Sequence, residues 1–121
     1  MILGIDHVGI AVHDDGAAET FARLLGAGTP AFDAVGAQAV RVCFLPAAPP
    51  NLELLTATAA GPISRFLERR GEGLHHVCFA VDDIAAELRR IEAAGFELID
   101  RTPRDGHGGL VAFVHPRSTH G

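Results

Sequence analysis

The 121-residue sequence contains only two cysteines, too few for the disulfide framework that stabilises small secreted domains. Cys43 and Cys78 both lie in apolar runs, where a cysteine is expected to be a small, buried and reduced side chain. No stretch approaches the roughly 18 apolar residues that a membrane-spanning helix needs, and no basic segment precedes the first apolar residues. We therefore expect a cytoplasmic protein that does not bind membranes.

Basic residues are the minority, since 10 Lys and Arg stand against 15 Asp and Glu and give a formal net charge of −5 at pH 7. A negatively charged chain repels phosphate backbones and anionic lipids, which argues against nucleic acids and membranes as partners. The content of 48% hydrophobic and 21% charged residues is typical of a folded chain. At this length we expect a single domain over residues 1–121.

Phosphate loops and nucleophilic triads are missing as well. The Gly-His-Gly-Gly stretch at residues 106–109 lacks a Gly-Lys-Ser/Thr ending and a following helix, so we interpret it as a lid or a hairpin. No Ser-His-Asp or Cys-His arrangement has a supporting sequence context. The candidate functions therefore exclude P-loop nucleotide chemistry and triad hydrolysis.

What is present is an orderly succession of strand and helix patterns. Alternating β-branched residues predict a strand over residues 5–12, and apolar residues at three- and four-residue spacing predict a helix from Asp14 and Asp15 to Gly26. The segment 29–36 has only a weak pattern. The other expected elements are strands at 39–45, 51–55, 75–81 and 110–114, helices at 61–71 and 83–95, and a short hairpin loop over residues 46–50.

The chain contains an internal duplication at an offset of 69 residues. The offset relates His7 to His76, Val8 to Val77, Ala11 to Ala80, Val12 to Val81, Asp14 to Asp83 and Gly26 to Gly95. It predicts an α+β fold of two strand-helix-strand-strand-strand modules, at about 1–60 and 73–121, joined by a linker helix at 61–72. The second copy is incomplete, because the counterpart of the strand that holds Glu53 would follow Gly121.

Two histidines and one carboxylate form the candidate metal site. If the modules pair about a pseudo-twofold axis, His7 and His76 occupy equivalent positions on an inner face that they share with small residues. An inward carboxylate at Glu53 is expensive unless a cation neutralises it, and two imidazoles with a carboxylate suit a divalent transition metal. Taken alone, a strand histidine is more often a hydrogen-bonded core residue than a ligand, and Glu53 would more often be a solvent-facing strand residue. The duplication favours the metal site instead.

The remaining histidines carry weaker signals. His75 is expected to point away from the cavity, because neighbouring strand residues face opposite sides. Surface positions, or a supporting contact to a ligand, are the interpretation for the other four: His13, His107, His115 and His120.

Four segments together resemble the methylmalonyl-CoA epimerases of the vicinal oxygen chelate (glyoxalase/bleomycin resistance/dioxygenase) superfamily. They are residues 5–12, 52–55, 66–77 and 113–119, and the match spans nearly the whole chain. The resemblance implies a glyoxalase-like half-open barrel of paired βαβββ modules. It also implies a divalent ion, cobalt, manganese, nickel, zinc or magnesium, on His7, Glu53 and His76, with a fourth ligand and the catalytic base expected after Gly121. Where some members have a second acidic base, this sequence has Val42.

The activity implied by the resemblance is interconversion of (R)- and (S)-methylmalonyl-CoA through a metal-stabilised enolate. We expect the acyl-CoA substrate to contact Arg104, Gly108, Gly109 and Ser118. An exposed sheet edge favours a homodimer. Two alternatives remain open: a glyoxalase-type isomerase (lactoylglutathione lyase), and a non-catalytic protein that sequesters a ligand, as bleomycin-resistance proteins do.

Overall fold

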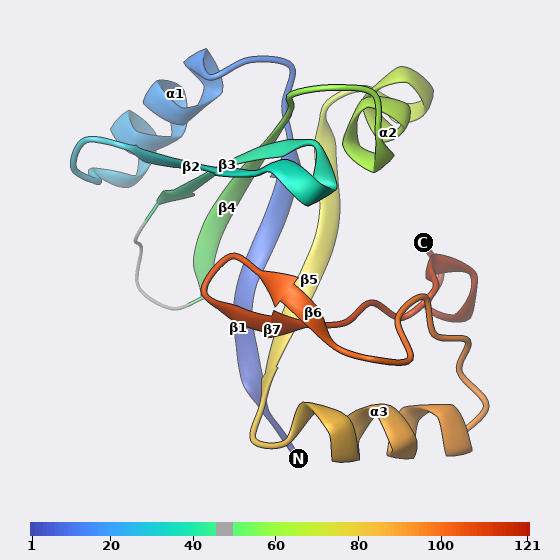
Figure 1. Ribbon diagram of the computed structural model, residues 1–121. Coiled ribbons are helices and arrows are strands. Elements are labelled where there is room, and N and C mark those ends of the chain that lie inside the picture. The colour runs from blue at the N-terminus through green and yellow to red at the C-terminus, as the bar shows by residue number, and fades with distance from the viewer. Residues whose placement is uncertain (46–49) are drawn as a thin grey trace. The chain divides into compact units, whose positions relative to one another are not determined.

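The computed structural model describes residues 1–45 and 50–121 (Figure 1). Contacts within the chain divide it into a sheet unit, residues 5–79, and a C-terminal unit, residues 1–4 with 80–121. The elements, in chain order, are β1 (Ile2–Ala11), α1 (Gly16–Leu25), β2 (Ala31–Val35), the 3-10 turn η1 (Gly36–Gln38), β3 (Val40–Leu45), β4 (Asn51–Ala57), α2 (Pro62–Arg70), β5 (Gly73–Val81), α3 (Ile84–Ala93), β6 (Arg104–Gly106), β7 (Gly109–Val111) and the 3-10 turn η2 (Pro116–Ser118).

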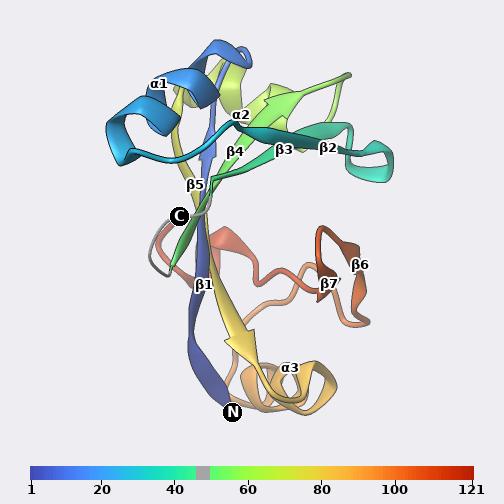
Figure 2. The same cartoon turned by 90° about the vertical axis from the view of Figure 1, so that its left-hand side faces the viewer.

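A five-stranded mixed sheet forms the centre of the sheet unit, with the strand order β2-β3-β4-β1-β5. Strand β1 pairs in parallel with β4, whereas β3 pairs antiparallel with both β2 and β4. Figure 2 shows β1 and β5 side by side along the sheet. The register sets Glu53 of β4 opposite Gly9 of β1 and, on its other side, Phe44 of β3. Glu53 therefore lies in an interior strand of the sheet.

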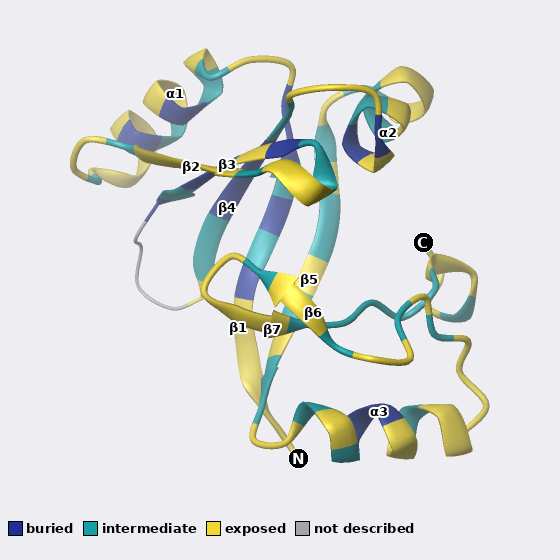
Figure 3. Ribbon diagram, in the orientation of Figure 1, coloured by how far each residue is buried: buried dark blue, intermediate teal, exposed yellow. Residues whose placement is uncertain are grey.

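Two clusters of buried apolar residues pack against this sheet, and Figure 3 shows buried positions along its strands. On one face, Leu54 and Val12 belong to a cluster with Ala18 and Ala22 of α1. On the other, Ala11 and Leu55 pack in a cluster with residues of β3 and α2, among them Ile63. Because side chains alternate along a strand, the face of the second cluster is also the face of His7, Gly9 and Glu53. The site thus lies beside a packed apolar layer.

Helix ends follow their sequence signals. Helix α1 ends at Gly26, which adopts a left-handed conformation with φ of 65°. Helix α3 begins after Asp83, whose carboxylate accepts a hydrogen bond from the Ala86 backbone N–H at 2.9 Å. The helix predictions over 61–71 and 83–95 are confirmed within one or two residues at each end.

The strand predictions are confirmed for β1, β3, β4 and β5, and the weakly patterned segment 29–36 contains β2. Strand β2 has exposed residues at four of its five positions, so no apolar alternation marks it, and it is held by pairing with β3. The expected hairpin of β3 and β4 is present as an antiparallel pair. Residues 46–49 of its loop lie outside the described residues.

The predicted strand at 110–114 is shorter than expected. Strand β7 covers only Gly109–Val111 and pairs with β6, so the glycine-rich segment forms a hairpin. Further on, the Phe113 backbone N–H donates to a carboxylate oxygen of Asp100 at 2.9 Å, and Val114 makes only an isolated bridge with Leu98. The Asp100 carboxylate therefore accepts the Phe113 N–H hydrogen bond that a neighbouring strand would accept if β7 continued.

Within the described ranges 1–45 and 50–121, no helix is long and apolar enough to span a bilayer. The observed order of elements and the mixed sheet confirm the predicted α+β class. The division into modules at 1–60 and 73–121 with a linker at 61–72 stays a prediction.

Candidate metal centre

The structure brings together the three residues that the sequence predicted as ligands, and all three belong to the sheet unit. The Nε2 atom of His7 lies 3.0 Å from Oε2 of Glu53 and 3.0 Å from Nε2 of His76. The ligand atoms of the group all lie within 4.8 Å of one another. Three side chains from three strands therefore converge on one small region.

Strand order explains the convergence. Strand β1 lies between β4 and β5, so His7 has Glu53 on one neighbouring strand and His76 on the other. Gly9, two residues after His7 on the same face, leaves room for the second imidazole. A Cβ atom on Gly9 would lie only 2.3 Å from Cε1 of His76. A residue without a side chain at position 9 is thus a requirement for the histidine pair.

The two imidazoles have opposite protonation preferences. Burial lowers the pKa of His7, but its hydrogen bonds with Cys78 and Asp6 and the charge of Glu53 outweigh burial and raise this pKa to about 9. Burial, with the nearby His75 and His7, lowers the pKa of His76 to about 4. Without a cation, a neutral His76 therefore faces a protonated His7 at pH 7.

The donor set fits a divalent cation. His7 and Glu53 are only 8% and 6% exposed, and a buried carboxylate needs a positive partner. Protonated His7 supplies that charge at present, and a cation on the same atoms would replace it. Two nitrogens and one oxygen suit Co²⁺, Mn²⁺, Ni²⁺ or Zn²⁺, whereas Mg²⁺ prefers oxygen ligands. Three protein ligands leave positions for water or substrate.

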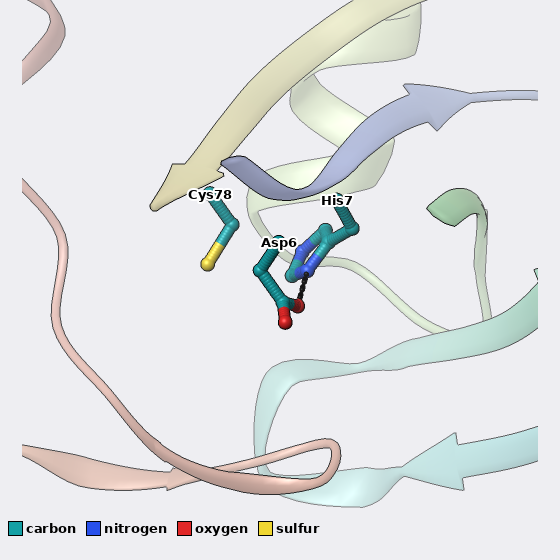
Figure 4. Close-up of side chains that lie close together, drawn as sticks. All are labelled: Asp6, His7 and Cys78. Carbon is teal, nitrogen blue, oxygen red and sulfur yellow. Dashed lines mark hydrogen bonds and ion pairs between the residues drawn. The ribbon is translucent and has the colours of Figure 1, made fainter. Parts of the chain in front are cut away.

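A second group with ligand chemistry surrounds the other side of His7 (Figure 4). Asp6, His7 and Cys78 also lie close enough to hold a cation, and Asp6 Oδ2 is 2.7 Å from Nδ1 of His7. Asp6 was not among the predicted site residues, and Cys78 was predicted to be a buried hydrophobe; Cys78 is half-buried. Their sequence positions could have indicated both residues, because Asp6 directly precedes His7 and Cys78 follows His76 by two residues on the same face of the strand.

His75 also differs from its expectation. We expected it to face away from the site, but its Nδ1 lies 2.9 Å from Nδ1 of His76. Its ring packs edge-to-face on Phe66 of α2 at a centroid distance of 4.9 Å. The two rings turn toward each other. The opposite Cβ directions of neighbouring strand residues therefore do not keep the two side chains apart.

The expected substrate contacts all lie in the C-terminal unit. Arg104 Nε is 3.3 Å from an Asp100 carboxylate oxygen, and its guanidinium lies 5.2 Å from the centroid of the Phe113 ring. Ser118 Oγ accepts a hydrogen bond from the Glu97 backbone N–H at 3.0 Å. Gly108 lies between β6 and β7 and has a φ of 83°. Gly109 is the first residue of β7 and has a φ of 152°. Their contact with substrate stays a prediction.

With this geometry established, comparison with known proteins defines the class. Residues 6–113 match the model of the glyoxalase/bleomycin resistance protein/dioxygenase superfamily. The chain therefore belongs to this superfamily, and the predicted glyoxalase-like fold is confirmed.

The chain is similar to several methylmalonyl-CoA epimerases and to one uncharacterized protein. The chain is 36% identical over its full length to the ethylmalonyl-CoA/methylmalonyl-CoA epimerase of Cereibacter sphaeroides, covering 94% of that protein. It is 38% identical to the uncharacterized protein YqjC of Bacillus subtilis, over 97% of this chain and 86% of that one. A solved methylmalonyl-CoA epimerase in complex with methylmalonyl-CoA and NH4+ superposes with a TM-score of 0.90 at 29% identity, over 99% of this chain and 90% of that one. The relationship to methylmalonyl-CoA epimerases covers fold and sequence together.

Proposed function

We propose that this protein is a divalent-metal-dependent epimerase that interconverts (R)- and (S)-methylmalonyl-CoA. The observation that carries the proposal is the convergence of His7, Glu53 and His76 within 4.8 Å. The named epimerase relative and the solved epimerase with methylmalonyl-CoA support the choice of substrate.

The chemistry is a proton transfer at C2 of the acyl group. The C2–H bond breaks, its proton goes to a base, and a proton returns to the opposite face of the same carbon. A divalent ion held there would supply a Lewis acid for negative charge on the thioester oxygen, an effect typically worth several kcal/mol. His7 and His76 would hold the ion through neutral nitrogens, and Glu53 would balance its charge. The base itself is not assigned to a residue of the chain.

Substrate binding falls to the C-terminal unit in this proposal. The Arg104 guanidinium can pair with a carboxylate or a phosphate of the acyl-CoA, and such charge-assisted bonds are about twice as strong as neutral ones. The backbone N–H groups of Gly108 and Gly109 and the Ser118 hydroxyl would add neutral hydrogen bonds. These residues bind and orient the substrate and take no part in the proton transfer.

We also propose a homodimer. Strand β5 is an edge of the sheet, and it carries three large apolar side chains that are exposed by 42% to 61%: Leu74, Val77 and Phe79. An apolar sheet edge is a common site of self-association. Sedimentation that shows a monomer at micromolar concentration would contradict this assignment.

Isotope exchange tests the activity directly. We would remove metal with a chelator, reload the protein with Co²⁺ and incubate it with one methylmalonyl-CoA epimer in D₂O. The expected result is deuterium at C2 and formation of the second epimer, both absent from the chelated protein. The variant His76→Ala, with its fold checked by circular dichroism, serves as the matched negative control. Absence of exchange in the Co²⁺-loaded protein would refute the proposal.

Two further assays separate the alternatives within the superfamily. Formation of lactoylglutathione from methylglyoxal and glutathione would favour a glyoxalase-type isomerase. Tight ligand binding by the metal-free protein without turnover would favour a sequestering protein.

A further inference from the structure

The duplication of the ligand histidines extends to the residues that precede them. Asp6 and His75 are related by the same offset of 69 residues that relates His7 to His76. Each contacts the Nδ1 atom of the histidine that follows it, Asp6 at 2.7 Å and His75 at 2.9 Å. The Nε2 atoms of both histidines point the other way, 3.0 Å from each other. Each module therefore presents one imidazole with an inner nitrogen and an outer partner.

The outer partners determine where the ring protons can be. A neutral imidazole has one N–H and one lone pair, and an ionised carboxylate only accepts hydrogen bonds. Nδ1 of His7 must therefore donate to Asp6, which leaves the lone pair of a neutral His7 on Nε2. Between His75 and His76 one Nδ1 must donate to the other. If His76 is the donor, its lone pair is also on Nε2, and His75 accepts.

We propose that Asp6 and His75 are paired positioning residues, which hold both ligand imidazoles in the tautomer that directs a lone pair from Nε2 to the cation. The inference rests on the metal-binding part of the proposed function and is independent of the substrate. Partners of this kind fix the ring orientation of a ligand histidine and raise its basicity. Here a carboxyl group contacts one ligand histidine and an imidazole contacts the other.

The surroundings of His75 support its role as an acceptor. The ring is half-buried and packs against Phe66, and the Arg70 guanidinium lies 5.7 Å from the centroid of the same Phe66 ring. A neutral His75 that carries its ring proton on Nε2 has its lone pair on Nδ1 and can accept a hydrogen bond there. Asp6 is more exposed, with a side chain 51% accessible.

The same geometry disfavours a cation on Asp6, His7 and Cys78. Such a cation would need the Nδ1 lone pair of His7, so the 2.7 Å hydrogen bond to Asp6 would be lost. The ring proton would then move to Nε2, where it blocks the nitrogen that faces Glu53 and His76. The proposal therefore requires that Cys78 sulfur does not bind the metal.

Cobalt affinity of four variants tests the two positions. Asp6→Ala and His75→Leu remove the acceptors, and each is expected to weaken Co²⁺ binding by about 10- to 100-fold in a chelator competition titration. Asp6→Asn and His75→Asn retain an oxygen that can accept from Nδ1–H, and each should recover most of the loss. Glu19→Ala in α1 removes an exposed carboxylate elsewhere and should leave the affinity unchanged.

The outcomes separate this proposal from a purely structural role. Circular dichroism and urea denaturation report whether a variant folds, and loss of affinity in a folded variant with recovery in the Asn variant supports positioning. Unchanged cobalt affinity in Asp6→Ala and His75→Leu would overturn the proposal. It would also be overturned if Asp6→Asn and His75→Asn lost as much affinity as Asp6→Ala and His75→Leu. A sulfur-to-cobalt charge-transfer band that disappears in Cys78→Ala would also overturn it, because the cation would then use the Nδ1 side.

Failure of the proposed activity is distinguishable. Wild-type protein that binds Co²⁺ with these variant effects but does not exchange deuterium at C2 refutes the epimerase and leaves the positioning roles standing. Exchange-active protein whose variants bind Co²⁺ normally refutes the positioning roles alone.

Discussion

The imidazole of His76 lies directly over Gly9, so close that a Cβ atom there would come within 2.3 Å of Cε1 and 2.8 Å of Nε2. The contact joins two neighbouring strands of the sheet and involves the nitrogen that faces His7. His76 can therefore occupy this position only because residue 9 has no side chain.

Gly9→Ala is expected to displace His76 and to weaken Co²⁺ binding by at least about tenfold, since the ligand loses its place in the group. Overpacking of this kind also costs about 1–3 kcal/mol of stability. Chelator competition and urea denaturation measure the two effects. Gly28→Ala is the matched control, because nothing lies within 4 Å of a Cβ there. Unchanged cobalt affinity in Gly9→Ala would show that His76 is not a ligand.

Metal removal is expected to lower thermal stability. A ligand that binds only the folded state at 100 times its dissociation constant stabilises that state by about 2.7 kcal/mol. Addition of Co²⁺ to chelated protein should therefore raise Tm in a concentration-dependent manner. Glu53→Gln removes the buried negative charge with little change in volume and should largely abolish the increase. An equal Tm increase in this variant would mean that the ion binds elsewhere.

Cobalt binding should strengthen with pH. In the metal-free protein the pKa of His7 is about 9, so a proton must leave Nε2 before the cation binds. Affinity should rise up to about pH 9 and level off above it. Calorimetry in buffers of different ionisation enthalpy should detect close to one proton released at pH 7. A proton count near zero at this pH would contradict the His7 assignment.

The same two pKa values predict the pH dependence of metal-free stability. His7 has a folded-state pKa above its ordinary value of 6.5, so its contribution is complete below pH 6.5 and is lost as the pH rises through 9. His76 has a lowered pKa of about 4, so its burial destabilises the fold as the pH falls from 6.5 to 4. Urea denaturation across pH 4–9 measures both limbs. His76→Gln should flatten the acid limb, and an unchanged acid limb would contradict this account.

The core beside the site should respond strongly to truncation. Leu54 is 1% exposed in β4, next to Glu53, and Leu54→Ala is expected to cost about 2–5 kcal/mol in urea denaturation. Leu24 in α1 is 75% exposed, and Leu24→Ala should change stability by less than about 0.5 kcal/mol. Similar effects of both substitutions would show that Leu54 is not packed as described.

Local sequence patterns predicted much of the fold. Period-two alternation predicted β1 and β5, and three- and four-residue spacing predicted α1 and α3. Strand β2 was not predicted, because four of its five positions are exposed and its place depends on pairing with β3. The end of β7 was also missed, since the Asp100 carboxylate that occupies the Phe113 N–H is thirteen residues away.

The candidate site divides in the same way. His7 and His76 were found because the duplication marks them, and Glu53 because a charge interrupts an apolar strand. The contacts of Asp6 and His75 with the two histidines were not predicted, since strand alternation assigns a neighbouring side chain to the opposite face. Only the ring orientations in the folded chain bring each of them to an Nδ1 atom.

By itself the sequence determined which residues repeat and which faces are apolar, because period and composition are local properties. The tertiary structure decided that β1 lies between β4 and β5, and with it the 3.0 Å approaches among His7, Glu53 and His76. Strand order depends on which packing buries the most apolar surface across the whole chain, and no local pattern encodes that choice.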